Sequence, residues 1–138
     1  MKIGVPKEIK PQETRIGLTP DSVKDLVSNG HQVLIENNGG SEAGFDNSHY
    51  TSAGAKIIDS AEEVYKSSEM IVKVKEPIPD EYKFLRDDLT VFAYLHLAGD
   101  PENAKKLMPF GACELNMLKM WPPQYIIFAV WNAKYTEL

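Results

Sequence analysis

Short apolar runs alternate with helix-like segments along the first 107 residues, and this rhythm constrains the fold more than any other feature. The strand-like runs lie at residues 2–5, 31–36, 55–58, 70–74 and 89–95, and the helix-like segments at 20–29, 47–53, 60–65, 80–85 and 100–107. Such alternation is typical of right-handed βαβ units that build a parallel sheet. We therefore predict an α/β fold: an open parallel sheet with flanking helices, Rossmann-like or flavodoxin-like, and incomplete at its C-terminus.

Local signals support the predicted helix ends. Thr19 is a good N-cap residue and is followed by Pro20, which suits the first helical position. Gly30 lies where a helix-terminating glycine belongs. Ser60 and Glu63 have the spacing of a capping box.

Composition excludes several classes of protein. The 138 residues fit one domain, and the net charge of −5 argues against a nucleic-acid binder or a protein bound to anionic membranes. The single cysteine, Cys113, excludes an intrachain disulfide and a multi-cysteine zinc site, and no metal-ligand cluster is evident. The longest apolar run, residues 125–131, is too short to cross a bilayer, and no secretory signal is recognisable. We expect a soluble, cytoplasmic protein.

The last thirty residues differ in composition from the rest. Between residues 109 and 138 only four residues are charged: Glu114, Lys119, Lys134 and Glu137. Trp121-Pro122-Pro123 would stop a helix. Residues 125–131 could form a final strand of the sheet. The interpretation we prefer is a tail that does not belong to the preceding fold.

Three polar residues follow predicted strands, at the edge where open parallel sheets bind ligands. Arg15 lies in the long loop after the first strand, Lys75 ends the run at 70–74, and His96 ends the run at 89–95. A guanidinium can hold a carboxylate through two parallel hydrogen bonds, an ammonium can donate to a carbonyl oxygen, and an imidazole can transfer a proton near neutral pH. Together they predict a site for a small carboxylic acid.

Each of these residues also has a purely structural interpretation. Arg15 could be a solvated surface residue beside Glu13, Lys75 could pair with Glu76 at the strand end, and His96 could be a buried core histidine. The glycine-rich segment 39–44 matches neither a P-loop nor the dinucleotide fingerprint G-x-G-x-x-G, and a turn is the better interpretation.

Four motifs, in order along residues 1–108, resemble the alanine dehydrogenase family. They are Gly4-Val5-Pro6-Lys7-Glu8, Glu13-x-Arg15-Ile16-Gly17-Leu18-Thr19-Pro20, Val72-Lys73-Val74-Lys75-Glu76-Pro77 and Tyr94-Leu95-His96-Leu97-Ala98. The N-terminal part of nicotinamide nucleotide transhydrogenase is similar, but it generally lacks the lysine and histidine corresponding to Lys75 and His96. The resemblance therefore favours the dehydrogenase branch.

The resemblance implies reversible NAD-dependent oxidative deamination of L-alanine to pyruvate and ammonia. It implies that Arg15 and Lys75 bind substrate and that His96 is the catalytic acid or base. It also implies a homo-oligomer, although which surfaces would form it is open.

The departures from the family are equally informative. Residues 1–108 correspond to the substrate-side domain, residues 109–138 do not resemble the family, and the NAD-binding domain with its glycine fingerprint is absent. A truncated or frameshifted reading frame would produce such a chain. We expect it to be inactive alone, and the alternatives are a transhydrogenase fragment or a stand-alone module that binds amino or keto acids.

Overall fold

The computed structural model describes residues 1–95, 101–107 and 129–131, and it has the predicted α/β architecture. The strands are β1 (Lys2–Val5), β2 (Gln32–Glu36), β3 (Lys56–Ile58), β4 (Met70–Lys75), β5 (Thr90–Tyr94) and β6 (Ala129–Trp131). The helices are α1 (Pro20–Ser28), α2 (Asn47–Ser52), α3 (Ala61–Ser67) and α4 (Pro101–Leu107), with 3₁₀ segments η1 (Ser41–Ala43) and η2 (Pro79–Phe84).

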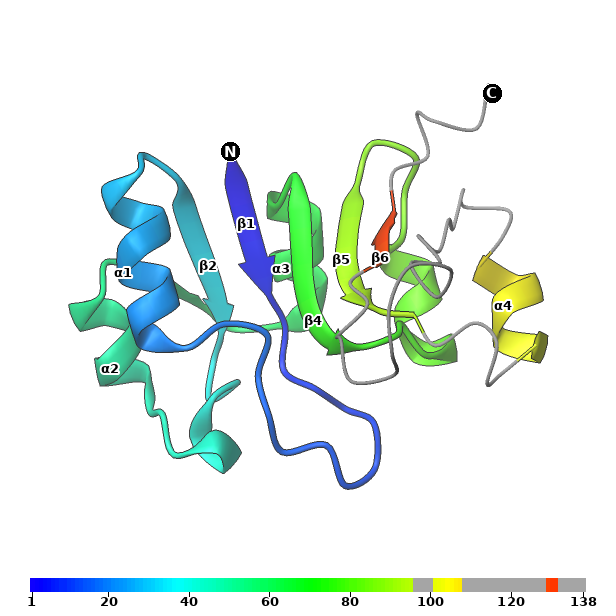
Figure 1. Cartoon of the computed structure of the whole chain (residues 1–138), viewed down its shortest axis with the longest axis horizontal. Helices are drawn as coiled ribbons and strands as arrows, with labels where there is room; N and C mark the ends of the chain where they lie inside the picture. Colours follow the sequence, from blue (N-terminus) through cyan, green and yellow to red (C-terminus); the bar gives the residue numbers. More distant parts are fainter. Residues whose placement is uncertain (96–100, 108–128, 132–138) are drawn as a thin grey trace, which may run out of the picture.

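The strands form one sheet in the order β3-β2-β1-β4-β5-β6. Strands β1 to β5 are mutually parallel, and β6 pairs antiparallel with β5. The carboxyl ends of β1, β2, β4 and β5 therefore share the lower edge of the sheet in Figure 1. The chain runs outward from β1 to β2 and β3, and then returns to place β4 on the other side of β1. The β1/β4 boundary is thus the topological switch point, where doubly wound sheets open a crevice.

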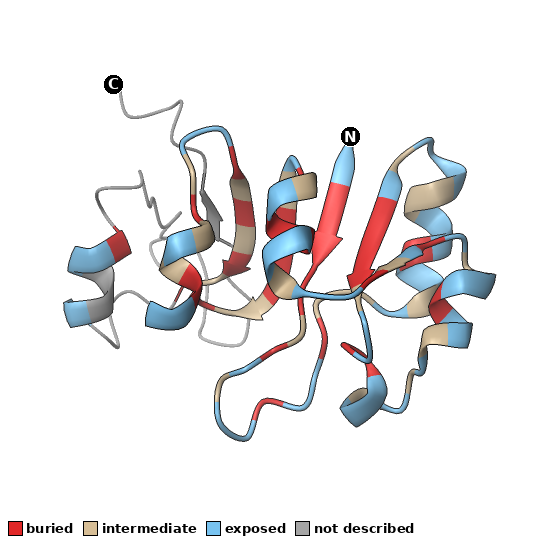
Figure 2. Cartoon of the chain, turned by 180° about the vertical axis from the view of Figure 1, so that it is seen from behind, coloured by how far each residue is buried: buried red, intermediate tan, exposed pale blue. Residues whose placement is uncertain are grey.

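Both faces of the sheet are covered, as the apolar strands predict. One core cluster joins Val5, Val33 and Ile35 to Val23 of α1 and Tyr50 of α2. A second cluster on the opposite face packs the two buried residues of α3 against β4, β5 and Leu107 of α4. Figure 2, seen from behind, shows α3 lying over the buried strands.

The predicted helix ends are confirmed for α1. The Thr19 hydroxyl accepts a hydrogen bond from the backbone N–H of Ser22, Pro20 is in the first turn, and Gly30 has φ +83° just beyond the helix. Before α3, the Ser60 hydroxyl accepts from the backbone N–H of Glu63, which is half of the predicted capping box.

Two segments differ in detail from the sequence predictions. The helix predicted at 80–85 is the 3₁₀ segment η2, and it ends before Leu85, whose backbone is extended. The backbone N–H groups of Glu81 and Leu85 donate to the carbonyl oxygens three residues earlier, those of Ile78 and Tyr82, which is the hydrogen-bond pattern of a 3₁₀ helix. Within the tail, the structure describes only β6, which lies in the run at 125–131 that could form a final strand and pairs antiparallel with β5.

Among the described residues, no helix is long and apolar enough to cross a membrane.

Candidate functional site

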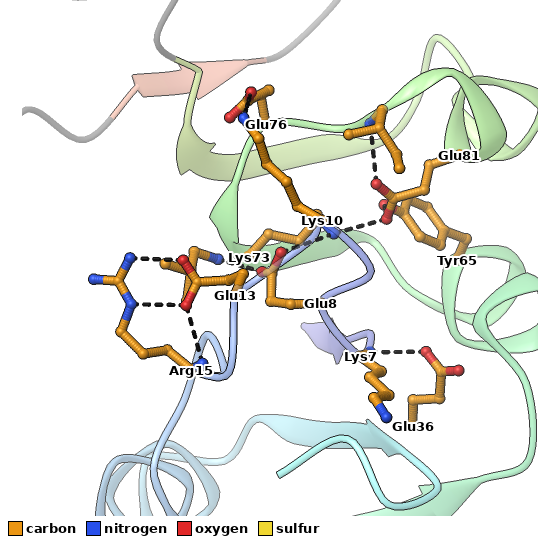
Figure 3. A network of polar contacts seen from close by, with 12 residues as sticks. Lys7, Glu8, Lys10, Glu13, Arg15, Glu36, Tyr65, Lys73, Glu76 and Glu81 are labelled. Carbon is orange, nitrogen blue, oxygen red and sulfur yellow. Dashed lines mark hydrogen bonds and ion pairs between the residues drawn. The ribbon is translucent and has the colours of Figure 1, made fainter. Parts of the chain in front are cut away.

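The loop between β1 and α1, residues 6–19, folds back over the carboxyl end of β4. Gly17 makes this approach possible, because a Cβ atom there would lie 2.5 Å from the carbonyl oxygen of Val72. Ile16, beside it, is buried in the same core cluster as Val72. The charged residues of the loop are thereby brought against the charged end of β4, as Figure 3 shows.

One group of these charges is sealed inside the protein, and we call it the buried network: Glu8, Lys73, Glu81 and Tyr65. The Lys73 side chain is 1% exposed, and its Nζ lies 2.7 Å from Glu81 Oε1 and 3.4 Å from Glu8 Oε2. The Tyr65 hydroxyl donates to Glu81 Oε1 at 3.0 Å. Two acidic side chains thus share a single lysine next to the switch point (Figure 3).

The buried network perturbs the acidity of its members. Burial raises the pKa of the Glu8 carboxyl above its usual value of 4.5, and the positive charge of Lys73 opposes that rise. The pKa of Tyr65 lies well above 10, because burial and the Glu81 carboxylate both disfavour the phenolate. The protein therefore buries several ionisable groups of its own beside the switch point.

A second group of charges has one member in the solvent and one buried, and we call it the open pair: the exposed Arg15 and the buried Glu13. Arg15 donates from Nε to Glu13 Oε1 at 2.8 Å and from Nη2 to Glu13 Oε2 at 2.7 Å. The Arg15 side chain is 66% exposed, whereas the Glu13 side chain is 6% exposed. The guanidinium lowers the pKa of Glu13 to about 2, and the positive charge of Lys75 contributes in the same direction.

The structure locates two of the three predicted site residues. Arg15 lies beside Glu13, as its structural interpretation anticipated, and the pairing is a bidentate fork rather than a loose contact. Lys75 is the half-buried last residue of β4, opposite Tyr94 of β5. The positive charges of Arg15 and, to a smaller extent, Lys75 both lower the pKa of the Glu13 carboxyl. His96 lies outside the described residues.

The structural interpretation of Lys75 involved Glu76, and the structure gives Glu76 another partner. The Lys10 ammonium, from the loop after β1, forms an ion pair with the buried Glu76 carboxylate.

The sequence analysis did not single out Lys73, Glu8 and Glu81 as a group. One signal was available: Lys73 interrupts an apolar run predicted to be covered on both faces, and a charge buried in this way requires a partner. Glu81 comes from η2, the next element along the chain, but Glu8 comes from the distant loop after β1, and only the folded chain brings it to Lys73.

Comparison with known proteins places most of the chain in one family. The sequence model described as "Alanine dehydrogenase/PNT, N-terminal domain" matches residues 4–118. The chain belongs to this family. The match continues ten residues beyond the boundary at residue 108 that the motifs suggested.

Several relatives within the family are alanine dehydrogenases. The chain is 52% identical to the alanine dehydrogenase of Bacillus subtilis over 111 residues, and 46% identical to that of Staphylococcus epidermidis over 108 residues. These alignments cover 80% and 78% of this chain, but only 29% of each relative. The chain therefore spans less than a third of the length of the relatives it matches.

Solved structures agree with the sequence comparison. An L-alanine dehydrogenase superimposes with a TM-score of 0.76 at 51% identity, over 80% of this chain and 30% of that one. A transhydrogenase from Sinorhizobium meliloti superimposes with a TM-score of 0.71 at 28% identity, over 78% of this chain and 30% of that one.

Proposed function

We propose that this chain is the substrate-side part of an alanine dehydrogenase and that it binds L-alanine and pyruvate at the carboxyl ends of β4 and β5. The observation that carries the proposal is the fork between Arg15 and Glu13. In this fork the Arg15 guanidinium holds a carboxylate, that of Glu13, through two parallel hydrogen bonds, and the positive charge of Lys75 also acts on that carboxylate, which supports a carboxylate-binding role for both cations.

A substrate carboxylate has room on the same guanidinium. Glu13 engages only the Nε/Nη2 edge, and the Nη1 end points away from Glu13 in Figure 3. Because alanine and pyruvate offer little apolar surface, their carboxylate must supply most of the recognition. We assign the substrate carboxylate to Arg15.

Lys75 and His96 complete the proposed site. Lys75 would donate a hydrogen bond to the carbonyl oxygen of pyruvate, or meet the amino end of alanine. His96, from the resemblance, would transfer the protons that addition of water to the imine requires. The reaction is the reversible NAD-dependent oxidative deamination of L-alanine to pyruvate and ammonia.

The residues described here do not fit NAD itself. In a dinucleotide-binding sheet, the turn after the first strand carries a glycine fingerprint that receives the pyrophosphate. Here the corresponding turn carries Glu8, whose carboxylate lies against β4 and would repel a phosphate. We propose that the cofactor is held by another part of a full-length dehydrogenase and that these 138 residues alone do not turn over. We further propose a cytoplasmic location and a homo-oligomer, as the family implies.

The second candidate is the N-terminal part of a transhydrogenase, which the structural match at 28% identity supports. The higher identity to alanine dehydrogenases, together with Lys75 and His96, favours the first candidate.

The test is pyruvate binding by the whole chain, measured by calorimetry or NMR titration, with Arg15→Gln as the variant. Loss of a charge-assisted pair should weaken binding about 10- to 100-fold. Lys7→Gln removes the same charge from the same loop, where Lys7 pairs with Glu42, and should leave the affinity within about twofold.

Two results would contradict the proposal. Equal losses in the two variants would reduce the role of Arg15 to general electrostatic attraction. Reduction of NAD by the purified chain with L-alanine would disprove the proposed inactivity of this chain.

A further inference from the structure

The end of β4 contains an irregularity that determines where Lys75 lies. Val72 pairs with Phe92, but the next paired residues are Lys75 and Tyr94. Three steps along β4 thus match two steps along β5, so β4 holds one extra residue, a β-bulge. Bulges redirect the side chains that follow them and are frequent beside active sites. Without the extra residue, Val74 rather than Lys75 would lie opposite Tyr94.

Glu8, in the loop that follows β1, contacts the backbone of this bulged segment. Glu8 Oε1 accepts a hydrogen bond from the backbone N–H of Val74 at 2.6 Å. The backbone N–H of Lys75 also favours the ionised form of Glu8 and lowers its pKa. The Glu8 side chain is 2% exposed, so water competes little for the bulged backbone.

The buried network holds Glu8 in this position. Lys73, the residue between Val72 and Val74, directs its ammonium to Glu8 Oε2 and to Glu81 Oε1. The bulge is therefore held from both sides, by the backbone contact of Val74 and by the side chain of Lys73.

We propose that Glu8 is a positioning residue of the site: it holds the bulge that places Lys75 opposite Tyr94, where Lys75 meets the carbonyl end of the substrate. The second half of this statement rests on the proposed function. Glu8 acts through the backbone of β4 and does not itself touch the substrate.

Removal of Glu8 is an interpretable experiment because it does not strand a buried charge. In Glu8→Ala, Lys73 keeps its contact with Glu81 at 2.7 Å, so the variant should fold. Glu8→Gln retains an oxygen that can accept from Val74. Glu36→Ala is the matched control, since Glu36 Oε2 accepts from the backbone N–H of Lys7 at 2.8 Å, at the end of β2 instead of β4.

The first measurement uses NMR on the free chain. Glu8→Ala should accelerate amide hydrogen exchange at Val74 by about tenfold or more and remove the cross-strand contacts between Lys75 and Tyr94. Glu8→Gln should restore most of the slow exchange at Val74 and of the contacts between Lys75 and Tyr94. Glu36→Ala should leave the exchange and the contacts as in the wild type. Unchanged exchange and register in Glu8→Ala would overturn the proposal.

The second measurement compares pyruvate with propionate, which has the carboxylate but no carbonyl group. Glu8→Ala should weaken pyruvate binding about tenfold and leave propionate binding unchanged. Glu8→Gln should restore most of the affinity for pyruvate. An equal change for both ligands would make Glu8 merely structural and overturn its positioning role. If the wild type binds neither ligand, the proposed function fails, and the register measurement alone decides whether Glu8 positions Lys75.

Discussion

The buried network and the open pair lie on the same edge of the sheet and draw on the same loop, yet they are opposite electrostatic solutions. In the buried network, two carboxylates share the Lys73 ammonium, and all three side chains are at most 3% exposed. In the open pair, Arg15 is largely in water and holds a single carboxylate. Neighbouring parts of one loop therefore serve different purposes in our proposals. The buried network holds the backbone of β4, and Arg15 of the open pair stays accessible to a ligand.

The two glutamates of the loop, Glu8 and Glu13, have pKa values shifted in opposite directions. Glu8 has a raised pKa because burial dominates its surroundings, and Glu13 has a pKa of about 2 because the Arg15 fork dominates. They are five positions apart in the sequence. Chemical type does not distinguish them. The partner of Glu13 is Arg15, two residues along the chain, whereas Glu8 meets Lys73 from a distant strand.

The largest expected effect is a difference in the free energy of unfolding between variants of Lys73 and Lys75. Lys73→Met leaves Glu8 and Glu81 buried without their shared cation, and the loss of one partner from a buried ion pair costs about 3–5 kcal/mol. Lys75→Met, two residues away and half-buried, should cost about 0.5 kcal/mol or less. Urea unfolding of both variants measures the difference. Similar losses would mean that the buried network contributes no more than a surface charge.

An intermediate effect is expected at Gly17, which connects the loop to β4. In Gly17→Ala the new methyl group would press on the carbonyl oxygen of Val72, and such overpacking costs about 1–3 kcal/mol. Thr14→Ala, at an exposed position of the same loop, should change the free energy of unfolding by about 0.5 kcal/mol at most. Thermal unfolding of the two variants measures the difference. A Gly17→Ala variant as stable as the wild type would show that the loop does not need this close approach.

The smallest effect is a difference in pH dependence between the two glutamates. The pKa of Glu13 is about 2 in the folded chain and has an ordinary value of 4.5, so its carboxylate stabilises the fold above pH 4.5. That contribution disappears as the pH falls toward 2. The pKa of Glu8 is raised, so its ionisation opposes folding as the pH rises above 4.5.

Chemical unfolding of the wild type, Glu13→Gln and Glu8→Gln across this range measures the effect. The advantage of the wild type over Glu13→Gln should shrink on acidification from pH 4.5 toward 2. The stability of the wild type relative to Glu8→Gln should fall as the pH rises from 4.5. Parallel pH profiles for the two variants would contradict the electrostatic contrast.

Much of the fold could be predicted because its signals are local. The run at residues 2–5 forms β1 with the predicted bounds, and Thr19 and Pro20 begin α1 as predicted. The segment at 80–85 could be recognised as helical but not as 3₁₀, since its pattern of apolar residues does not determine whether backbone N–H groups bond three or four residues back. Arg15 and Lys75 could be selected as candidates because they follow strands, although their binding role stays a prediction.

The amino-acid order by itself determined the strand and helix succession, the helix caps and the family, because periodicity, capping chemistry and motif spacing are properties of neighbouring residues. Tertiary structure alone decided that Lys73 is buried while Arg15 is exposed, that Glu8 accepts a hydrogen bond from Val74 in the bulged segment of β4, and that Glu76 pairs with Lys10. The physical reason is desolvation. The energy of a charge depends on which distant groups exclude water from it, and those groups gather only when the chain folds.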